Sequence, residues 1–250
     1  MCSRLSIYSP SLEESLASHH NIHPDKWRGK SQYEPKYSVR YEKSAPVLMM
    51  DTKNPKEPSL VLEQMRWGMQ RKDFNDRTNI IDIFTAKATT LVDASKVWSR
   101  VRLRGRCIVP CNGYFAIPNE PGISPHFVKK ENGSLLLLAA IYELLPTNDG
   151  YGFSVVTTIS SPPMSKFHKE RPVFLLTSAD VNAWLDTSSG KWSEELSDIA
   201  ENRHNDNPSG VLSYHTVSDN IRMRTAPDSP SLIEPLVIPH FTAMPEPKLT

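Results

Sequence analysis

CIVPCNGYF at residues 107–115 and SLLLLAAIY at residues 134–142 are short apolar runs of the length that is typical of β-strands. Polar and turn-forming residues separate them, which favours strands over long buried helices. Further runs of this kind predict strands at 47–50, 59–69, 153–158, 173–176 and 211–217. Helical patterns are fewer, and they predict helices over 93–104, over 178–186 with a serine cap, and over 193–200.

The order of these elements predicts an α+β fold. Strands follow one another without a regular alternation of strand and helix, which argues against a doubly wound parallel sheet. We expect a curved, partly closed antiparallel sheet or barrel with a few peripheral helices. A chain of 250 residues with 38% hydrophobic residues suits one large domain or two small ones, and we expect one domain over residues 1–237. The Pro-rich end, 238–250, predicts a flexible tail.

Composition limits the classes of protein that fit. No apolar run approaches the ~18 residues that span a bilayer, and the N-terminus lacks a secretory pattern, so we expect a soluble, intracellular protein without membrane contact. The three cysteines form an odd set, which fits a reducing compartment. Cys107 and Cys111 fit buried small hydrophobes better than zinc ligands, and burial would raise the pKa of the Cys107 thiol and make it inert. No phosphate-binding glycine loop or metal cluster is present, so we expect neither cofactor nor metal.

Cys2 follows the initiating methionine, and this position gives it chemistry that an internal cysteine lacks. If Met1 is removed, which a small second residue allows, Cys2 carries a free amine beside its thiol. An amine with a pKa of roughly 8 is partly neutral at pH 7 and attacks an aldehyde, after which the thiol closes the imine into a five-membered thiazolidine. The alternative is an accidental cysteine in a frayed terminus.

Two stretches gather positive charge although the net charge is only +1. One surrounds Trp67-Gly68 and the other leads into the run at 107. Their cations are Arg66, Arg71, Lys72 and Arg77, and then Lys96, Arg100, Arg102, Arg104 and Arg106. Cations that track phosphates around a ring that stacks on bases are typical of single-strand binders. The alternative is a solvated helix face beside a core tryptophan.

Several segments resemble, in chain order, one known family. They are Met1-Cys2-x-Arg4; Arg66-Trp67-Gly68-Met69; Arg106-Cys107-Ile108-Val109-Pro110 with Gly113-Tyr114-Phe115; Thr157-Thr158 ahead of Phe167-His168 and Pro172-Val173; and Val217-Ser218 with Pro230-x-Leu232-Ile233-Glu234-Pro235. Together they look like the SRAP family, the SOS-response-associated peptidases, whose members shield abasic sites in single-stranded DNA by crosslinking to them. The resemblance implies an SRAP-like fold and a partner that is single-stranded or junction DNA with abasic sites.

The resemblance also implies roles for particular residues. Cys2 would attack the ring-opened aldehyde of the abasic sugar, and His168 would move the protons that this reaction requires. Trp67, beside Gly68, would fill the gap left by a missing base or wedge against the stack. The cations that would hold the DNA backbone are Arg4, Arg66, Lys87 and Arg222.

The chain departs from the family pattern at the helper positions. Where the family has Gly-Phe-Tyr-Glu-Trp, residues 113–117 read Gly-Tyr-Phe-Ala-Ile, so Ala116 replaces a proton-transferring acid. Where the family has Asn-Ala-Arg-x-Glu-Thr, residues 85–90 read Thr-Ala-Lys-Ala-Thr-Thr, so Thr85 replaces the asparagine and Lys87 keeps the charge of the arginine without its bidentate fork. The family's His-x-Arg-Met-Pro reads His168-Lys169-Glu170-Arg171-Pro172, and Glu170 is a candidate to take over from the missing acid.

These departures predict a weakened crosslinking or lyase activity, and a weakened removal of the protein's own Met1. The alternative is a catalytically degenerate relative that binds DNA without a covalent bond. General proteolysis is the weakest hypothesis, because no local Cys-His-Asn signature is present. We expect a monomer, in the nucleus of a eukaryotic host or in the cytoplasm or nucleoid of a bacterial one.

Overall fold

The computed structural model describes residues 3–54, 56–72, 80–94, 97–146, 150–162, 164–167, 169–201 and 211–236. Its strands are β1 (Arg4–Ile7), β2 (Lys26–Arg28), β3 (Lys36–Arg40), β4 (Ser44–Asp51), β5 (Ser59–Trp67), β6 (Met69–Lys72), β7 (Ile80–Ile83), β8 (Thr85–Lys87), β9 (Arg106–Cys111), β10 (Gly113–Ala116), β11 (His126–Lys130), β12 (Leu136–Leu144), β13 (Tyr151–Ile159), β14 (Glu170–Pro172) and β15 (Leu212–Thr216). Its α-helices are α1 (Leu12–His20), α2 (Ala88–Val92), α3 (Val101–Arg104), α4 (Ser178–Leu185) and α5 (Glu194–Glu201), and 3-10 turns include η1 (Lys30–Gln32), η2 (Met164–Lys166), η4 (Asp219–Arg222) and η5 (Pro230–Leu232).

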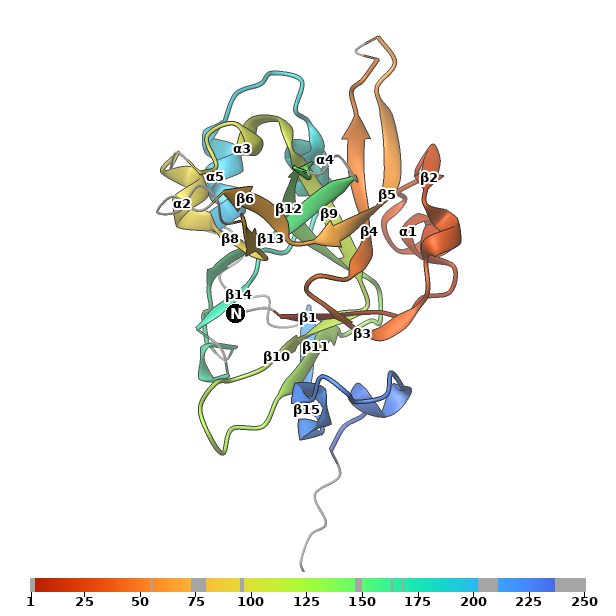
Figure 1. Ribbon diagram of the computed structural model, residues 1–250, viewed down its shortest axis with the longest axis vertical. Coiled ribbons are helices and arrows are strands. Elements are labelled where there is room, and N and C mark those ends of the chain that lie inside the picture. The colour runs from red at the N-terminus through yellow and green to blue at the C-terminus, as the bar shows by residue number, and fades with distance from the viewer. Residues whose placement is uncertain are drawn as a thin grey trace, which may run out of the picture.

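Strands β13, β12, β9, β4 and β5 follow one another into a ring, which a parallel pairing of β13 with β5 closes (Figure 1). At the closure Gly152 lies opposite Arg66, and Phe153 lies opposite Trp67. The other pairings around the ring are antiparallel. The predicted α+β fold with a curved, partly closed and mostly antiparallel sheet is therefore confirmed.

Two glycines allow the ring to close. A Cβ added to Gly152 would lie 2.5 Å from the carbonyl oxygen of Gly68, so no larger residue fits without moving the backbone. Gly68 itself has φ +133°, which L side chains rarely adopt. Its N–H donates to the carbonyl oxygen of Phe153 at 2.8 Å. The Trp67-Gly68 segment therefore belongs to the closure of the ring.

A second sheet lies below the ring in Figure 1 and has the strand order β15-β11-β10-β1-β3 within the described residues. Strand β1 pairs antiparallel with β10 on one side and with β3 on the other. All residues of β1 are buried. The chain segment that follows Cys2 is therefore fixed in the middle of a sheet.

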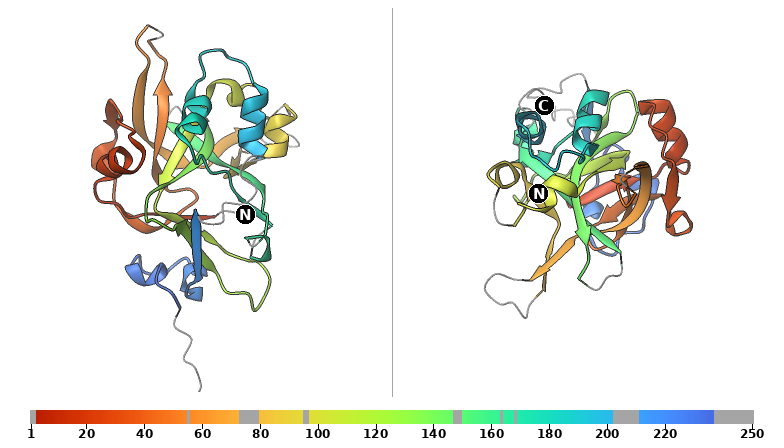
Figure 2. Two further views of the ribbon diagram at one scale, coloured as in Figure 1. Left: turned by 180° about the vertical axis from the view of Figure 1, so that it is seen from behind. Right: turned by 90° about the horizontal axis from the view of Figure 1, so that it is seen from above.

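The helices pack outside the ring, with α1 on the flank opposite α2 and α5 (Figure 2). Helices α4 and α5 confirm the predictions over 178–186 and 193–200, but Thr177 rather than a serine caps α4, in a capping box with Asp180. Of the predicted helix over 93–104, only Val101–Arg104 (α3) is helical among the described residues. Helix α2 ends at Val92, and Ala94 has φ +51°, which breaks the helix before α3 begins at Val101.

Most predicted strands match observed ones. The elements that were not predicted include those of the polar N-terminal region and β7, β8, α2 and β11, and the strand predicted at 173–176 is not observed. Helix α1 buries only Leu12 and Leu16, so its sequence carries a weak periodic signal. In place of a strand at 173–176, β14 ends at Pro172 and Phe174 forms an isolated bridge with Leu138. The predicted tail at 238–250 lies outside the described residues, so the domain boundary stays a prediction.

Candidate functional site

An ion pair between Lys87 and Glu170 joins two strands that both pair with β13. Lys87 ends β8 and lies opposite Thr157, and Glu170 begins β14 and lies opposite Ile159. The Lys87 Nζ is 2.7 Å from the Glu170 Oε1. The hydrogen bond and the negative charge of Glu170 raise the pKa of Lys87, so this residue stays cationic at neutral pH.

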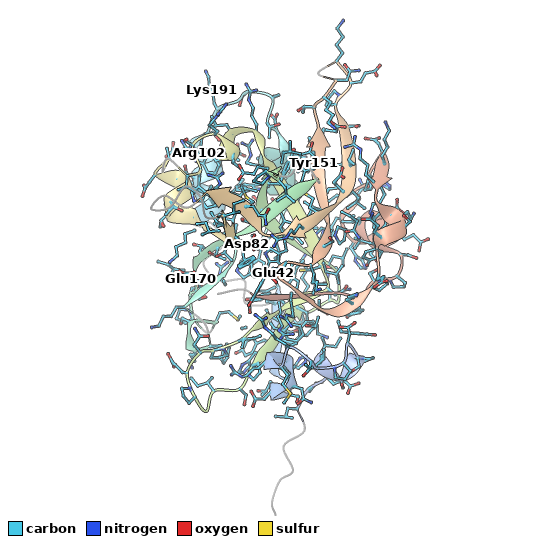
Figure 3. All side chains as sticks on the ribbon, viewed as in Figure 1. Glu42, Asp82, Arg102, Tyr151, Glu170 and Lys191 are labelled. Atoms are coloured by element: carbon cyan, nitrogen blue, oxygen red, sulfur yellow. The ribbon has the colours of Figure 1, made fainter. Side chains whose placement is uncertain are left out.

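The ion pair stands between two cavities. The first, of about 360 Å³, is called the loop cavity here because the β10–β11 loop forms one wall; it is lined by Lys87 and residues 117–120, 165–167, 169 and 170. The second, of about 500 Å³, is called the sheet cavity and is lined by residues 87–89, 157–161, 170 and 201. Figure 3 labels Glu170 at the edge of the molecule. Since both cavities include Lys87 and Glu170, the pair is their common wall.

Of the positions where the chain departs from the pattern described above, Lys87 and Glu170 line the loop cavity. Ala116 ends β10, is only 1% exposed and directly precedes Ile117 in the cavity wall. Thr85 begins the strand that ends with Lys87 and pairs with Val155. The structure therefore brings β8, β10 and β14 to one place, with a methyl group at 116.

An aromatic cluster beside this cavity was not predicted from the sequence. The His126 ring stacks on the Phe167 ring with centroids 4.0 Å apart, and Tyr214 lies 5.0 Å from Phe167. Burial lowers the pKa of His126. His126 faces Ala116 across the β10–β11 pairing. No sequence signal marks it, because its partners come from distant segments.

Two predicted catalytic residues, Cys2 and His168, lie outside the described residues. Their described neighbours are informative. Arg4 is fixed in β1, and both Phe167 and Lys169 line the loop cavity. The roles of Cys2 and His168 stay predictions.

The predicted contact of Trp67 with bases needs correction. Trp67 is completely buried, its ring stacks on Phe153 at 6.0 Å, and its indole N–H donates to the carbonyl oxygen of Phe84 at 2.9 Å. Because no part of the ring is exposed, it has no face to offer to a base in this arrangement. The alternative of a core tryptophan describes Trp67.

Two of the arginines that were predicted to bind phosphates, Arg66 and Arg222, instead bind partners within the protein. Arg66 forms a bidentate pair with Asp82, with distances of 2.9 and 3.0 Å, and also donates to the carbonyl oxygen of Gly68. Arg222 donates to Asp219 and to the carbonyl oxygens of Pro118 and Ile123, so it anchors the β10–β11 loop. Lys87, whose side chain is 60% exposed, is the most accessible cation of the predicted set.

Besides Arg66, three cations of the two basic stretches have internal partners, while Arg100 and Arg104 are exposed. Arg71 pairs with Glu143, Arg102 donates to the carbonyl oxygens of Leu91 and Val92, and Arg106 is 1% exposed. Arg106 donates to backbone carbonyls, including that of Trp184. Arg102 therefore joins α3 to α2, Arg106 joins β9 to α4, and Arg71 joins β6 to β12. Arg77, Lys96 and the side chain of Lys72 lie outside the described residues.

Cys107 and Cys111 are buried, as predicted, and form no disulfide, and burial raises the pKa of the Cys107 thiol. Within the described ranges, no group of three or more His, Cys, Asp or Glu residues could hold a metal ion. None of the described helices is long and apolar enough to cross a membrane.

Comparison with known proteins decides the family. The family model for the SOS response associated peptidases (SRAP) matches residues 1–223. The chain belongs to the SRAP family. This SRAP protein is 25% identical over 213 residues to the abasic site processing protein YMR114C of Saccharomyces cerevisiae, an alignment that covers 83% of this chain and 55% of the relative. The chain thus spans about half the length of that relative.

Solved structures share the fold of this SRAP protein. A protein from Bacteroides thetaiotaomicron has a TM-score of 0.70 at 16% identity and covers 94% of this chain and 100% of its own. A phage-related protein from Bordetella bronchiseptica has a TM-score of 0.60 at 17% identity and covers 87% of this chain and 95% of its own. At these identities the likeness concerns the fold alone.

Proposed function

We propose that this SRAP protein binds single-stranded DNA and processes abasic sites, bonding to them through Cys2 after Met1 has been removed. The observation that carries the proposal is the family match from residue 1, which includes Cys2, together with the yeast relative named for abasic site processing. The described neighbours of Cys2 and His168 support it, because β1 is fixed in a sheet and the residues on either side of His168 line the loop cavity.

The chemistry balances without a cofactor. The neutral amine of Cys2 attacks the aldehyde carbon of the ring-opened abasic sugar, and the resulting carbinolamine loses water to give an imine. The Cys2 sulfur then adds to the imine carbon, and a proton moves to the nitrogen, which closes the thiazolidine. His168 would deliver and accept these protons, since an imidazole titrates near neutral pH.

Lys87 and Glu170 shape the substrate side of this reaction. Lys87 would contact a phosphate at the edge of both cavities, with its charge offset by Glu170, and Glu170 is the acid that would act in place of the one missing at 116. Loss of a positioned acid costs on the order of a hundredfold to ten-thousandfold in rate. We therefore propose a slow crosslinking protein.

A second function is a DNA-binding member of the family without covalent chemistry. The buried methyl group of Ala116 favours it, because this position beside the loop-cavity wall has no proton to give. In that case DNA affinity would survive Cys2→Ala, and neither version would form a covalent product.

The test is to incubate the full chain, with Met1 removal verified by intact mass, with a single-stranded oligonucleotide carrying one abasic site. Wild type should give an adduct that resists denaturation, and Cys2→Ala should give none. Equal affinity of both proteins for the same oligonucleotide would show that the variant is folded. The absence of an adduct from wild type, under conditions in which an active SRAP protein reacts, would overturn the covalent function and leave the binding function.

A further inference from the structure

A third cavity, of about 350 Å³, lies between β3, the start of β4 and the segment 224–228, and it is called the arginine cavity here. It shares no lining residue with the loop cavity or the sheet cavity. Five cationic side chains line it against two carboxylates: Arg4, Lys36, Arg40, Lys43 and Arg224 against Glu34 and Asp228. The wall therefore carries an excess of positive charge in a chain that is nearly neutral overall.

The two carboxylates are engaged elsewhere. Asp228 accepts from the backbone N–H groups of Tyr37 and Ser38, at 3.2 and 2.8 Å. Glu34 pairs with Lys36 at 2.9 Å. The backbone donors and Lys36 thus satisfy both carboxylates, and neither forms an ion pair with a guanidinium group of the wall within the described ranges.

Among the described residues, the side chains of Arg4 and Arg40 donate to neutral oxygens, and no carboxylate pairs with Arg4, Arg40 or Arg224. Arg4 is 8% exposed and donates to Ser38 Oγ and to the carbonyl oxygen of Met223, both at 3.0 Å. Arg40 donates to the carbonyl oxygen of Arg224 at 3.2 Å. Burial lowers the pKa of Arg4, and the positive charges of Arg40 and Arg224 lower it further. A buried charge without a counter-charge is costly, so an anion in this cavity would stabilise the arrangement.

We propose that the arginine cavity binds a phosphate group. Guanidinium groups match the geometry of phosphate oxygens through paired N–H donors. Arg4 supplies a charge that is fixed by β1, and the half-buried Arg40 and the exposed Arg224 line the same cavity and would add their guanidinium groups. A volume of this size falls in the range of small-molecule sites and leaves room for a sugar attached to the phosphate.

The site is physically connected to the loop cavity without being part of it. Arg222 anchors the β10–β11 loop, and the next residue, Met223, offers its carbonyl oxygen to Arg4. The segment 222–224 therefore runs from one cavity to the other. A DNA strand that extends beyond the loop cavity and a free phosphate ester present the same group, so both are possible sources. Phosphate binding at this place does not depend on the chemistry of Cys2.

The experiment removes the two accessible guanidinium groups and leaves Arg4 in place. The variant Arg40→Gln/Arg224→Gln is compared with Lys53→Gln/Lys191→Gln, which loses the same charge from exposed positions. Lys53 lies in the turn between β4 and β5, and Figure 3 shows Lys191 at the far end of the molecule from the segment 222–236. Thermal unfolding of both variants without ligand checks that they are folded.

One arm measures the binding of an intact single-stranded oligonucleotide that has no abasic site. If strand phosphates occupy the cavity, the arginine variant should bind at least about tenfold more weakly than the lysine variant. The slope of its log affinity against log salt concentration should also become shallower by about 0.7 for each phosphate that the variant no longer binds. The other arm measures the unfolding temperature in millimolar inorganic phosphate. A rise in wild type and the lysine variant that is absent from the arginine variant would assign the cavity to free phosphate.

Either of those results supports the proposal and identifies the source of the phosphate. Equal DNA affinity of the two variants, together with no phosphate-dependent stabilisation that the arginine variant lacks, would overturn it. This holds even if both variants bind DNA more weakly than wild type, because the loss of net charge alone would then explain the effect.

Discussion

The Lys87 ammonium and the Glu170 carboxylate lie 2.7 Å apart, and together they form the wall between two cavities. The resemblance of residues 168–172 to the pattern His-x-Arg-Met-Pro implies that Glu170 takes the place of an arginine, so a carboxylate would stand in place of a cation beside Lys87. The pair neutralises the most accessible charge at the candidate site. Since the Lys87 side chain is 60% exposed, salt screens the pair, and its role concerns ligand binding more than folding.

Glu170→Gln should separate the two roles of this acid. The substitution frees Lys87 for a phosphate, so affinity for intact single-stranded DNA should rise about two- to fivefold. If Glu170 also moves a proton, the rate of crosslinking to an abasic oligonucleotide should fall although binding improves. Glu120→Gln is the matched control, because Glu120 also lines the loop cavity while Lys87 pairs with Glu170. An unchanged crosslinking rate would remove Glu170 from the chemistry.

Trp67→Phe should lower stability and leave DNA affinity unchanged. The substitution removes the indole hydrogen bond to the carbonyl oxygen of Phe84, which keeps its hydrogen bond from the Val155 N–H at 3.1 Å, so the loss should cost about 0.5–1.5 kcal/mol. Trp27→Phe is the control, because the indole N–H of Trp27 has no hydrogen-bond partner in the part of the chain that the structure describes, and its removal should cost less. Chemical denaturation and oligonucleotide binding check both expectations. A loss of affinity in folded Trp67→Phe would restore Trp67 as a base-contacting residue.

Thiol labelling should identify Cys2 as the reactive cysteine. Cys107 and Cys111 are fully buried, and burial raises the pKa of the Cys107 thiol, so neither forms an accessible thiolate. With an alkylating reagent at pH 8, the folded wild type should take one label for each chain, and folded Cys2→Ala should take none. In denaturant the counts should become three and two, as the cysteine content requires. Rapid labelling of folded Cys2→Ala would contradict the predicted inertness of the buried pair.

His20 should make the stability depend on pH. Burial, followed by the nearby charge of Lys130, lowers the pKa of His20 from 6.5 to about 4, and its Nε2 lies 2.9 Å from the carbonyl oxygen of Leu135. As the pH falls from 6.5 to 4, the unfolded chain takes up a proton that the folded chain does not bind, so stability is full above this window and declines through it.

His20→Gln should flatten the decline between pH 6.5 and about 4, and His23→Gln, which changes an exposed histidine, should not. Urea unfolding at several pH values measures the effect. The same slope in His20→Gln and wild type would show that other groups cause the pH dependence.

Local patterns in the sequence were enough to predict those strands and helices whose signal lies within a few residues. The apolar runs around 107–115 and 134–142 became β9, β10 and β12, because burial on a sheet requires continuous apolar side chains. Helix α4 was predicted because its polar N-terminal cap and the apolar side chains that it buries lie within a few residues of each other in the chain. Helix α1 was missed because it buries only two side chains and takes its stability from tertiary contacts.

The sequence by itself determined the family, the α+β class and the burial of Cys107, since these follow from motif order and local apolar pattern. Only the tertiary structure decided which charges have internal partners. Arg66 meets Asp82, Lys87 meets Glu170, and Arg4 meets two neutral oxygens. Trp67 is buried where β5 pairs with β13 and closes the ring, next to Gly152. The physical reason is that an ion pair or a buried ring depends on atoms from distant segments, and local sequence does not specify which segments meet.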